Sequence, residues 1–267
     1  MNTASLFRKI TTAYRLWCNN RITVLMYHSI STDKQDPWSV TPQMFTEQMD
    51  WLKRKKFNVL SLDQAVEHIL QSKNNRKCIV ITFDDGYKDF LEAAVPILKK
   101  NNFTASIFIP TELIGSTSQW DSFNKNKPLL DWQELKEVAR LGYDIGSHSK
   151  THPDLTMLTN EQLQDELSQS KQMLENELHI TIPSFSYPFG KYTDREIEAV
   201  KNTGYLSAVT VRDSLGNDSK TDVFAIERVA MSNKDSLYDF AVKVSGRKKV
   251  MHILYSYLKT KKYEPVA

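Results

Sequence analysis

The chain has 267 residues, of which 40% are hydrophobic, which is enough for one enzyme-sized domain with a buried core. The net charge is only +3, and the two cysteines, Cys18 and Cys78, exclude a small fold that depends on several disulfides. No run reaches the about 18 apolar residues of a membrane-spanning helix. The N-terminus also lacks the pattern of a secretory signal, so we expect a cytoplasmic protein.

Apolar runs with strand character alternate with segments of helical periodicity along most of the chain. In chain order, the strand-like runs lie near residues 22–28, 77–83, 103–109, 143–147, 184–187, 205–210 and 224–229. The helical patterns lie near residues 42–56, 62–72, 88–101, 131–141, 160–178 and 193–203. Thr41 before Pro42 marks one helix start, and Thr159 with Gln162 forms a capping-box pattern at another. This alternation predicts a parallel α/β fold and leaves open whether the sheet closes into a barrel or stays open and doubly wound.

Two acidic residues and a glycine follow the strand-like run at 77–83. Neighbouring residues of a strand face opposite sides, so Asp84 and Asp85 can serve one site only where the strand breaks into a loop. Gly86 permits that break, because glycine tolerates backbone angles that other residues avoid. Asp-Asp-Gly is also a common turn sequence, so on its own this motif predicts only a turn.

Two histidines follow the strand-like run at 143–147. His148 and His152 are four residues apart, and Pro153 disfavours a single helix through both. A catalytic zinc site takes three protein ligands from histidine and carboxylate side chains and keeps one position for water. His148, His152 and one aspartate of the first motif meet that count, and the second aspartate is then free to act as a base beside the water. The spacing does not decide which aspartate has which role.

Both motifs resemble those of the polysaccharide deacetylase family (NodB homology, carbohydrate esterase family 4). Residues 82–86 resemble its first motif, residues 147–153 resemble its second, and the resemblance extends from about Ile22 to Arg228. It implies an irregular (β/α)7 barrel and a hydrolase that removes the N-acetyl group from an N-acetylated sugar in a glycan, oligosaccharide or lipid-linked precursor. A deformylase or O-deacetylase with the same metal centre stays open as an alternative.

The resemblance also assigns roles to the four residues of these motifs. It implies that Asp84 is the general base, and that Asp85, His148 and His152 bind a divalent metal ion, usually zinc. The third family motif, Arg-x-Pro-Tyr, is altered here, because residues 186–189 read Ser-Tyr-Pro-Phe.

We expect the Phe189 N–H still to face the oxyanion of the reaction, since a backbone donor does not depend on the side chain. Tyr187 is expected on the same substrate side, and Arg228 is expected to supply the missing positive charge. The altered motif leaves open a catalytically impaired barrel that only binds carbohydrate.

A further histidine lies at the end of the first strand-like run. Tyr27-His28 resembles an element of a deacetylase subset that includes biofilm poly-N-acetylglucosamine deacetylases. Catalytic groups of parallel barrels lie at the C-terminal ends of strands, and histidine titrates near neutral pH. We therefore expect His28 in the pocket, as the candidate acid that protonates the departing amine. Trp38 and Trp120 lie in loop segments and are candidates for sugar contacts or for packing.

Charge divides the chain into three predicted segments. Residues 1–21 carry four basic and no acidic residues, residues 241–267 carry seven basic and one acidic residue, and the catalytic segment 22–240 between them is net acidic. Apolar residues recur at helical spacing in both ends, which predicts basic amphipathic segments. These either pack on the barrel or contact an anionic membrane surface or a lipid-linked glycan. The acidic centre argues against nucleic acid as a partner.

Overall fold

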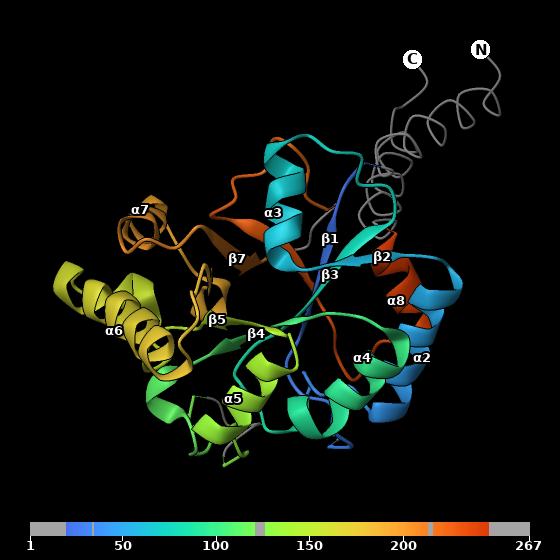
Figure 1. Ribbon diagram of the computed structural model, residues 1–267, viewed down its shortest axis with the longest axis horizontal. Helices are drawn as coiled ribbons and strands as arrows, with labels where there is room; N and C mark the ends of the chain where they lie inside the picture. The colour runs from blue at the N-terminus through green and yellow to red at the C-terminus, as the bar shows by residue number, and fades with distance from the viewer. Residues whose placement is uncertain (1–19, 34, 121–125, 213–215, 246–267) are drawn as a thin grey trace, which may run out of the picture.

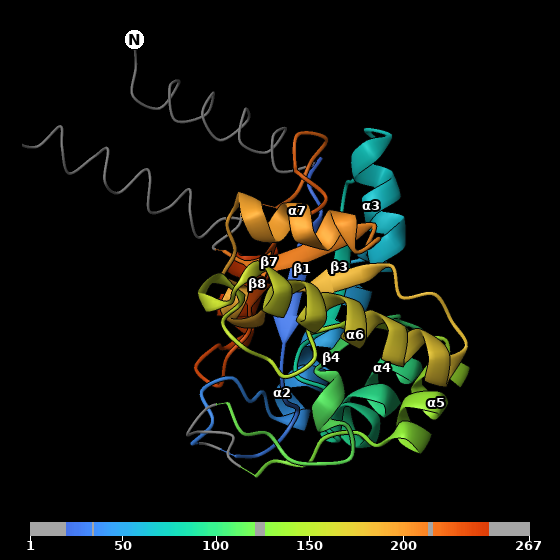
Figure 2. The ribbon, with the colours of Figure 1, turned by 90° about the vertical axis from the view of Figure 1, so that its left-hand side faces the viewer.

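The computed structural model describes residues 20–33, 35–120, 126–212 and 216–245, and its strands lie in the middle of the molecule with helices around them (Figures 1 and 2). The strands are β1 Thr23–Tyr27, β2 Asn58–Leu60, β3 Cys78–Phe83, β4 Ser106–Ile109, β5 Asp144–Ser147, β6 Ser184–Ser186, β7 Ser207–Val211 and β8 Ile226–Ala230. Every pairing between them is parallel, as the alternation of elements predicts.

The sheet closes into a barrel because β1 pairs with both β3 and β8. The ring runs β1-β8-β7-β6-β5-β4-β3 and back to β1, while β2 is added to β3 outside the ring. The predicted irregular (β/α)7 barrel is therefore confirmed. The three-residue strand β2 was not predicted, because so short a segment shows no period of its own.

Helices connect the strands and cover the barrel. They are α2 Pro42–Arg54, α3 Leu62–Leu70, α4 Val95–Asn101, α5 Trp132–Arg140, α6 Asn160–Leu178, α7 Asp194–Asn202 and α8 Leu237–Val244. The two predicted helix starts are confirmed, since Thr41 caps α2 and Thr159 forms a capping box with Gln162 at α6. The pattern near 88–101 differs in detail, because a π-helical turn, Phe90–Ala94, precedes α4.

Apolar side chains fill the barrel up to the level of the site. A compact cluster that includes Val24, Val80, Phe108 and Val209 occupies its interior, and a larger cluster packs between strands and helices. Gly146 on β5 is required there, because a Cβ at this position would lie 2.5 Å from the Phe108 ring. The apolar filling leaves the C-terminal ends of the strands for polar groups.

The predicted basic ends lie almost entirely outside the described residues. Of the segments 1–21 and 241–267, only residues 20–21 and 241–245 are described, so the domain boundaries and the membrane contact stay predictions. No helix within the described ranges is both long enough and apolar enough to span a membrane.

Candidate metal centre and active site

The predicted site residues come from different strands but meet at one end of the barrel. His28 follows β1, Asp84 and Asp85 follow β3, His148 follows β5, and Arg228 lies within β8. Because all strands are parallel, their C-terminal ends share one rim, where barrel enzymes place their catalytic groups.

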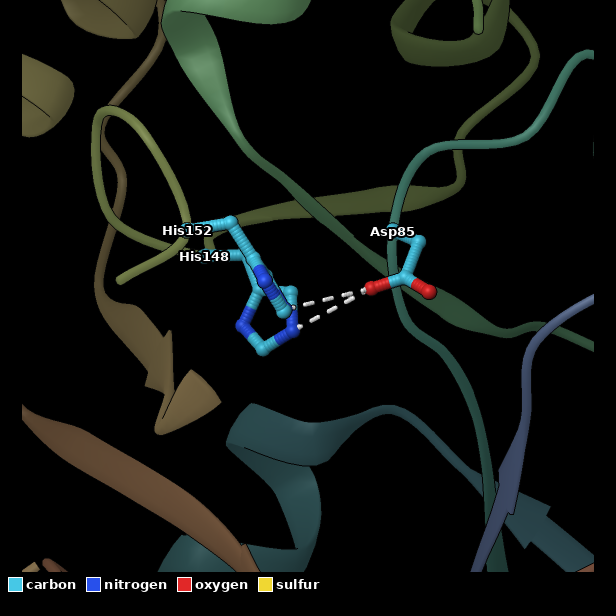
Figure 3. Close-up of side chains that lie close together, drawn as sticks. All are labelled: Asp85, His148 and His152. Carbon is cyan, nitrogen blue, oxygen red and sulfur yellow. Dashed lines mark ion pairs between the residues drawn. The ribbon is translucent and has the colours of Figure 1, made fainter. Parts of the chain in front are cut away.

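Asp85, His148 and His152 form a group in which one ligand atom from each lies within 4.8 Å of the other two (Figure 3). Asp85 Oδ1 is 3.5 Å from His148 Nε2 and 3.5 Å from His152 Nε2. Two ligand atoms that each bind one tetrahedral zinc ion at about 2.1 Å lie roughly 3.4 Å apart, so this spacing fits a single ion of that size. All three side chains are buried.

The environment of each histidine fits a role as metal ligand. The His148 Nδ1 donates to the Ser186 carbonyl oxygen at 2.7 Å, so Nε2, which faces Asp85, is the nitrogen available to a metal ion. The His152 ring packs between Trp120 and Phe189, with ring centroids 4.5 Å and 4.8 Å away. Its Nδ1 is buried and has no hydrogen-bond partner among the described residues.

Left-handed backbone turns let neighbouring residues serve the same site. β3 ends at Phe83, and Asp85 turns the chain immediately after Asp84 with φ of 74°; Gly86 continues the turn with φ of 69°. Ser149 and His152 have φ of 66° and 60°. Non-glycine residues rarely adopt such angles, and they persist where the surrounding structure holds them, often at functional sites.

Asp84 lies beside this group and forms a buried bidentate ion pair with Arg228. Arg228 Nη1 and Nη2 lie 2.7 Å and 2.6 Å from the two carboxylate oxygens of Asp84, and both side chains are almost fully buried. The guanidinium also donates to Thr82 Oγ1, Ser186 Oγ and the Thr210 carbonyl oxygen. Asp84 Oδ2 lies 4.0 Å from His148 Nε2, so the carboxylate is fixed next to the three candidate ligands.

The electrostatics keep both carboxylates charged. Burial raises the pKa of Asp84, but the Arg228 charge, the His148 charge and the Arg228 hydrogen bonds together lower it below its usual range. Burial likewise raises the pKa of Asp85, whereas the His148 hydrogen bond and the charges of His28, His152 and His148 lower it by more.

The two histidines of the group differ from each other. Burial lowers the pKa of His148, but Asp84 and Asp85 raise it above its ordinary value. Burial and the charge of His148 lower the pKa of His152 to about 3, so His152 is neutral at physiological pH, as a metal ligand must be.

The altered third motif is compensated from another strand. Ser186 faces into the barrel, where its hydroxyl accepts from Arg228 Nη2 at 2.9 Å and donates to Asp84 Oδ2 at 3.3 Å. The small serine leaves this space to the guanidinium, so the positive charge beside Asp84 comes from β8, as expected for Arg228.

Tyr187 is not brought to the site, which differs from the sequence prediction. Its hydroxyl donates to the Phe224 carbonyl oxygen, its ring stacks on Tyr192, and its N–H donates to the Val209 carbonyl oxygen. The reason is strand alternation, since Ser186 faces inward and its neighbour therefore faces the outer helices. Tyr27 likewise faces outward, and its hydroxyl donates to Gln48 Oε1 at 2.7 Å.

Phe189 and His28 lie at the edges of the site. Phe189 has a left-handed backbone with φ of 57°, and its half-exposed ring contacts His152. The His28 ring lies 5.4 Å from the ring of Trp38, and its buried Nδ1 has no hydrogen-bond partner among the described residues.

A cavity of about 500 Å³ opens beside His152, one of the three candidate ligands. Its lining includes Trp120, His152, Asp154 and Phe189. Trp120 lies next to His152 and Trp38 lies next to His28, so both rings are close enough to the site to contact a sugar. Sequence reasoning missed Thr82, whose only signal is its position two residues before Asp84 on the same face of β3.

Known proteins share both the sequence and the fold of this chain. A profile described as polysaccharide deacetylase matches residues 71–208. The protein YxkH of Bacillus subtilis, a provisionally named polysaccharide deacetylase, is 33% identical over 79% of this chain and 72% of its own length. A poly-beta-1,6-N-acetyl-D-glucosamine N-deacetylase of Staphylococcus epidermidis is 30% identical over 73% of this chain and 69% of its own length.

The fold also matches a solved structure. The structure of the Streptococcus pyogenes deacetylase PplD in complex with acetate superposes with a TM-score of 0.73 over 84% of this chain and 98% of that chain, at 24% identity. At this identity the match supports the barrel fold alone.

Proposed function

Because this chain belongs to the polysaccharide deacetylase family, we propose that it is a metal-dependent hydrolase that removes N-acetyl groups from the sugars of a glycan. The observation that carries the proposal is the convergence of Asp85, His148 and His152 beside the ion-paired Asp84. The similarity to the S. epidermidis enzyme supports a polymer or oligomer of N-acetylglucosamine as the substrate.

The three converging side chains would hold a divalent ion, which we propose is zinc. A bound ion would polarise the substrate carbonyl and make a water molecule acidic enough to react near neutral pH. Asp84 accepts the proton of the attacking water, because its low pKa keeps it charged and Arg228 fixes both of its oxygens. Arg228 itself is fully engaged with protein acceptors, so its role is to orient Asp84.

Two further groups complete the reaction. We assign the Phe189 N–H as a donor to the developing oxyanion, which is supported by its left-handed backbone and its position against His152. His28 is the candidate that protonates the departing amine, since it ends β1 at the same rim and has a buried nitrogen without a protein partner in the described chain.

Aromatic side chains around the site favour a sugar as substrate. Trp38, Trp120 and Phe189 come from three different loops, and each contacts a site histidine. Their rings offer the flat apolar surfaces on which pyranose rings pack, and the cavity beside Trp120 has room for a sugar unit.

Acetate release from a panel of defined sugars tests the proposal. The zinc-loaded protein is incubated with β-1,6-linked N-acetylglucosamine oligomers, with chitin oligomers, and with O-acetylated and N-formylated sugars. We expect acetate only from N-acetylated oligomers, and loss of release after chelation. Formate release or preference for O-acetyl esters would replace the proposed activity by a deformylase or an O-deacetylase. A lack of release from every substrate would contradict the proposal.

A further inference from the structure

The loop that carries both histidines, residues 148–152, is held in an uncommon conformation. Two of its five residues, Ser149 and His152, have left-handed backbone angles. Ser149 Oγ accepts the His152 N–H at 3.1 Å within the loop. The position of the His152 ring therefore depends on what keeps this backbone from relaxing, since such angles persist only under external restraint.

A carboxylate of helix α6 restrains the loop by accepting hydrogen bonds from it. Glu166 Oε2 accepts the N–H groups of Lys150 and Thr151, both at 2.9 Å. The second oxygen, Oε1, accepts the Thr151 hydroxyl at 2.6 Å. Glu166 is only 9% exposed, so these three bonds are made where water competes little.

A second contact from the same helix supports the start of the loop. Ser170 Oγ lies 2.7 Å from Ser147 Oγ, and Ser147 Oγ accepts the Ser149 N–H at 3.2 Å. The loop is thus attached to α6 at both Ser147 and Thr151. Of the three residues between the histidines, Lys150 and Thr151 donate their N–H groups to Glu166, while the Ser149 and Lys150 carbonyl oxygens accept the Thr111 and Glu112 N–H groups.

The neighbouring surface ion pairs do not explain the restraint. Lys150 Nζ lies 3.2 Å from Asp165 and 3.7 Å from Glu112, and both carboxylates are about half exposed. Exposed pairs of this kind contribute at most about 1 kcal/mol and do not fix backbone geometry. By contrast, loss of the Glu166 oxygens would leave two loop N–H groups without their acceptor.

We propose that Glu166 is a positioning residue for the metal centre, which sets the distance between His148 and His152 through the backbone that joins them. The proposal rests on the metal centre of the proposed function. Glu166 is not one of the three converging ligands and acts through the Lys150 and Thr151 N–H groups. Partners that orient metal ligands in this indirect way strongly affect metal affinity.

Zinc binding by the full chain tests the proposal without any substrate. Wild type, Glu166→Ala and Glu166→Gln are stripped with a chelator, and zinc affinity is measured by competition with a chromogenic chelator. Glu175→Ala is the matched control, because Glu175 lies on the same helix and accepts the Ile182 N–H at 3.0 Å, away from the histidine loop. Thermal melting of each metal-free variant reports the general loss of stability separately.

We expect Glu166→Ala to weaken zinc binding by about ten- to a hundredfold. Glu166→Gln should lose less zinc affinity than Glu166→Ala, because its amide oxygen can still accept both N–H groups while its NH2 group faces the Thr151 hydroxyl. Glu175→Ala should stay within about twofold of wild type in zinc affinity even if its melting temperature falls, because its site is separate from the loop.

Two results would overturn the proposal. One is wild-type zinc affinity in Glu166→Ala, and the other is an equal loss of zinc affinity in Glu166→Ala and Glu175→Ala. If Glu166→Ala does not fold, Glu166→Met carries the test, because methionine fills the same space but offers no oxygen to the Lys150 and Thr151 N–H groups, and wild-type zinc affinity in that variant would refute the proposal. If the wild-type chain binds no zinc, the proposed function is overturned as well. If wild type binds zinc and the Glu166 variants bind it with the same affinity, only this inference is overturned.

Discussion

Arg228→Met removes one partner of the buried ion pair beside the candidate metal ligands. Methionine has a similar length but no charge, so it leaves the Asp84 carboxylate buried without its bidentate donor. Asp84 is 3% exposed and Arg228 is 1% exposed, so water cannot replace the lost contacts without a structural change. We therefore expect a large loss of stability and a raised pKa of Asp84.

The magnitude follows from the burial of the pair. Removal of one partner from a buried ion pair costs about 3–5 kcal/mol, because the remaining charge is left without compensation. In the wild type the pKa of Asp84 is lowered, so its stabilising effect is present above its unfolded pKa and is lost as the pH falls through the folded pKa. In Arg228→Met the folded pKa is raised, so the stability difference from wild type should be largest near pH 8 and should narrow toward pH 4.

Urea unfolding at pH 8 and at pH 4, in buffer with a chelator, measures this difference. The double variant Arg228→Met/Asp84→Asn should recover part of the loss at pH 8, because it removes the unpaired charge. An Arg228→Met protein with wild-type stability at pH 8, or a double variant less stable than the single one, would refute the assigned role of the pair.

Three further changes have defined outcomes. Asp84→Asn should abolish acetate release but bind zinc with an affinity near that of wild type, because Asp84 is assigned as base and not as ligand; activity near the wild-type rate would contradict this. Trp120→Ala should raise KM for N-acetylated oligomers by about tenfold through loss of one stacked ring, with a smaller change in kcat; an unchanged KM would show that the ring only packs against His152. Burial and the neighbouring Asp63 raise the pKa of Asp144 to about 6, so its charged form destabilises the fold above that pH. Asp144→Asn should therefore raise the free energy of unfolding at pH 8 by up to about 3 kcal/mol and have little effect at pH 4. Equal effects at both pH values would show that the charge of Asp144 is not the cause.

The sequence was most informative where chemistry follows directly after a buried strand. Asp84, Asp85 and His148 each come after an apolar run, and parallel strands bring such residues to one rim whatever the details of the helices. The parallel α/β fold and the convergence of the two motifs were predictable for this reason, whereas closure into a barrel and the choice of Asp85 as ligand came from the family resemblance.

Other features depend on contacts between distant residues and gave no local signal. Whether Ser186 or Tyr187 faces the barrel interior depends on the strand register, which the local sequence does not show. The prediction that Tyr187 contacts substrate was wrong for this reason. Glu166 lies 15 and 16 residues from the loop that it binds, on a helix whose polar side otherwise faces solvent. Only the packing of α6 against the loop reveals its role.

Anomalous scattering at the zinc edge from crystals of the zinc-loaded protein tests the arrangement of the centre most directly. The account predicts one strong peak at about 2.1 Å from Asp85 Oδ1, His148 Nε2 and His152 Nε2 together, with Asp84 close to it but still paired with Arg228. A peak at another set of residues, or zinc bound by Asp84 in place of Asp85, would contradict it.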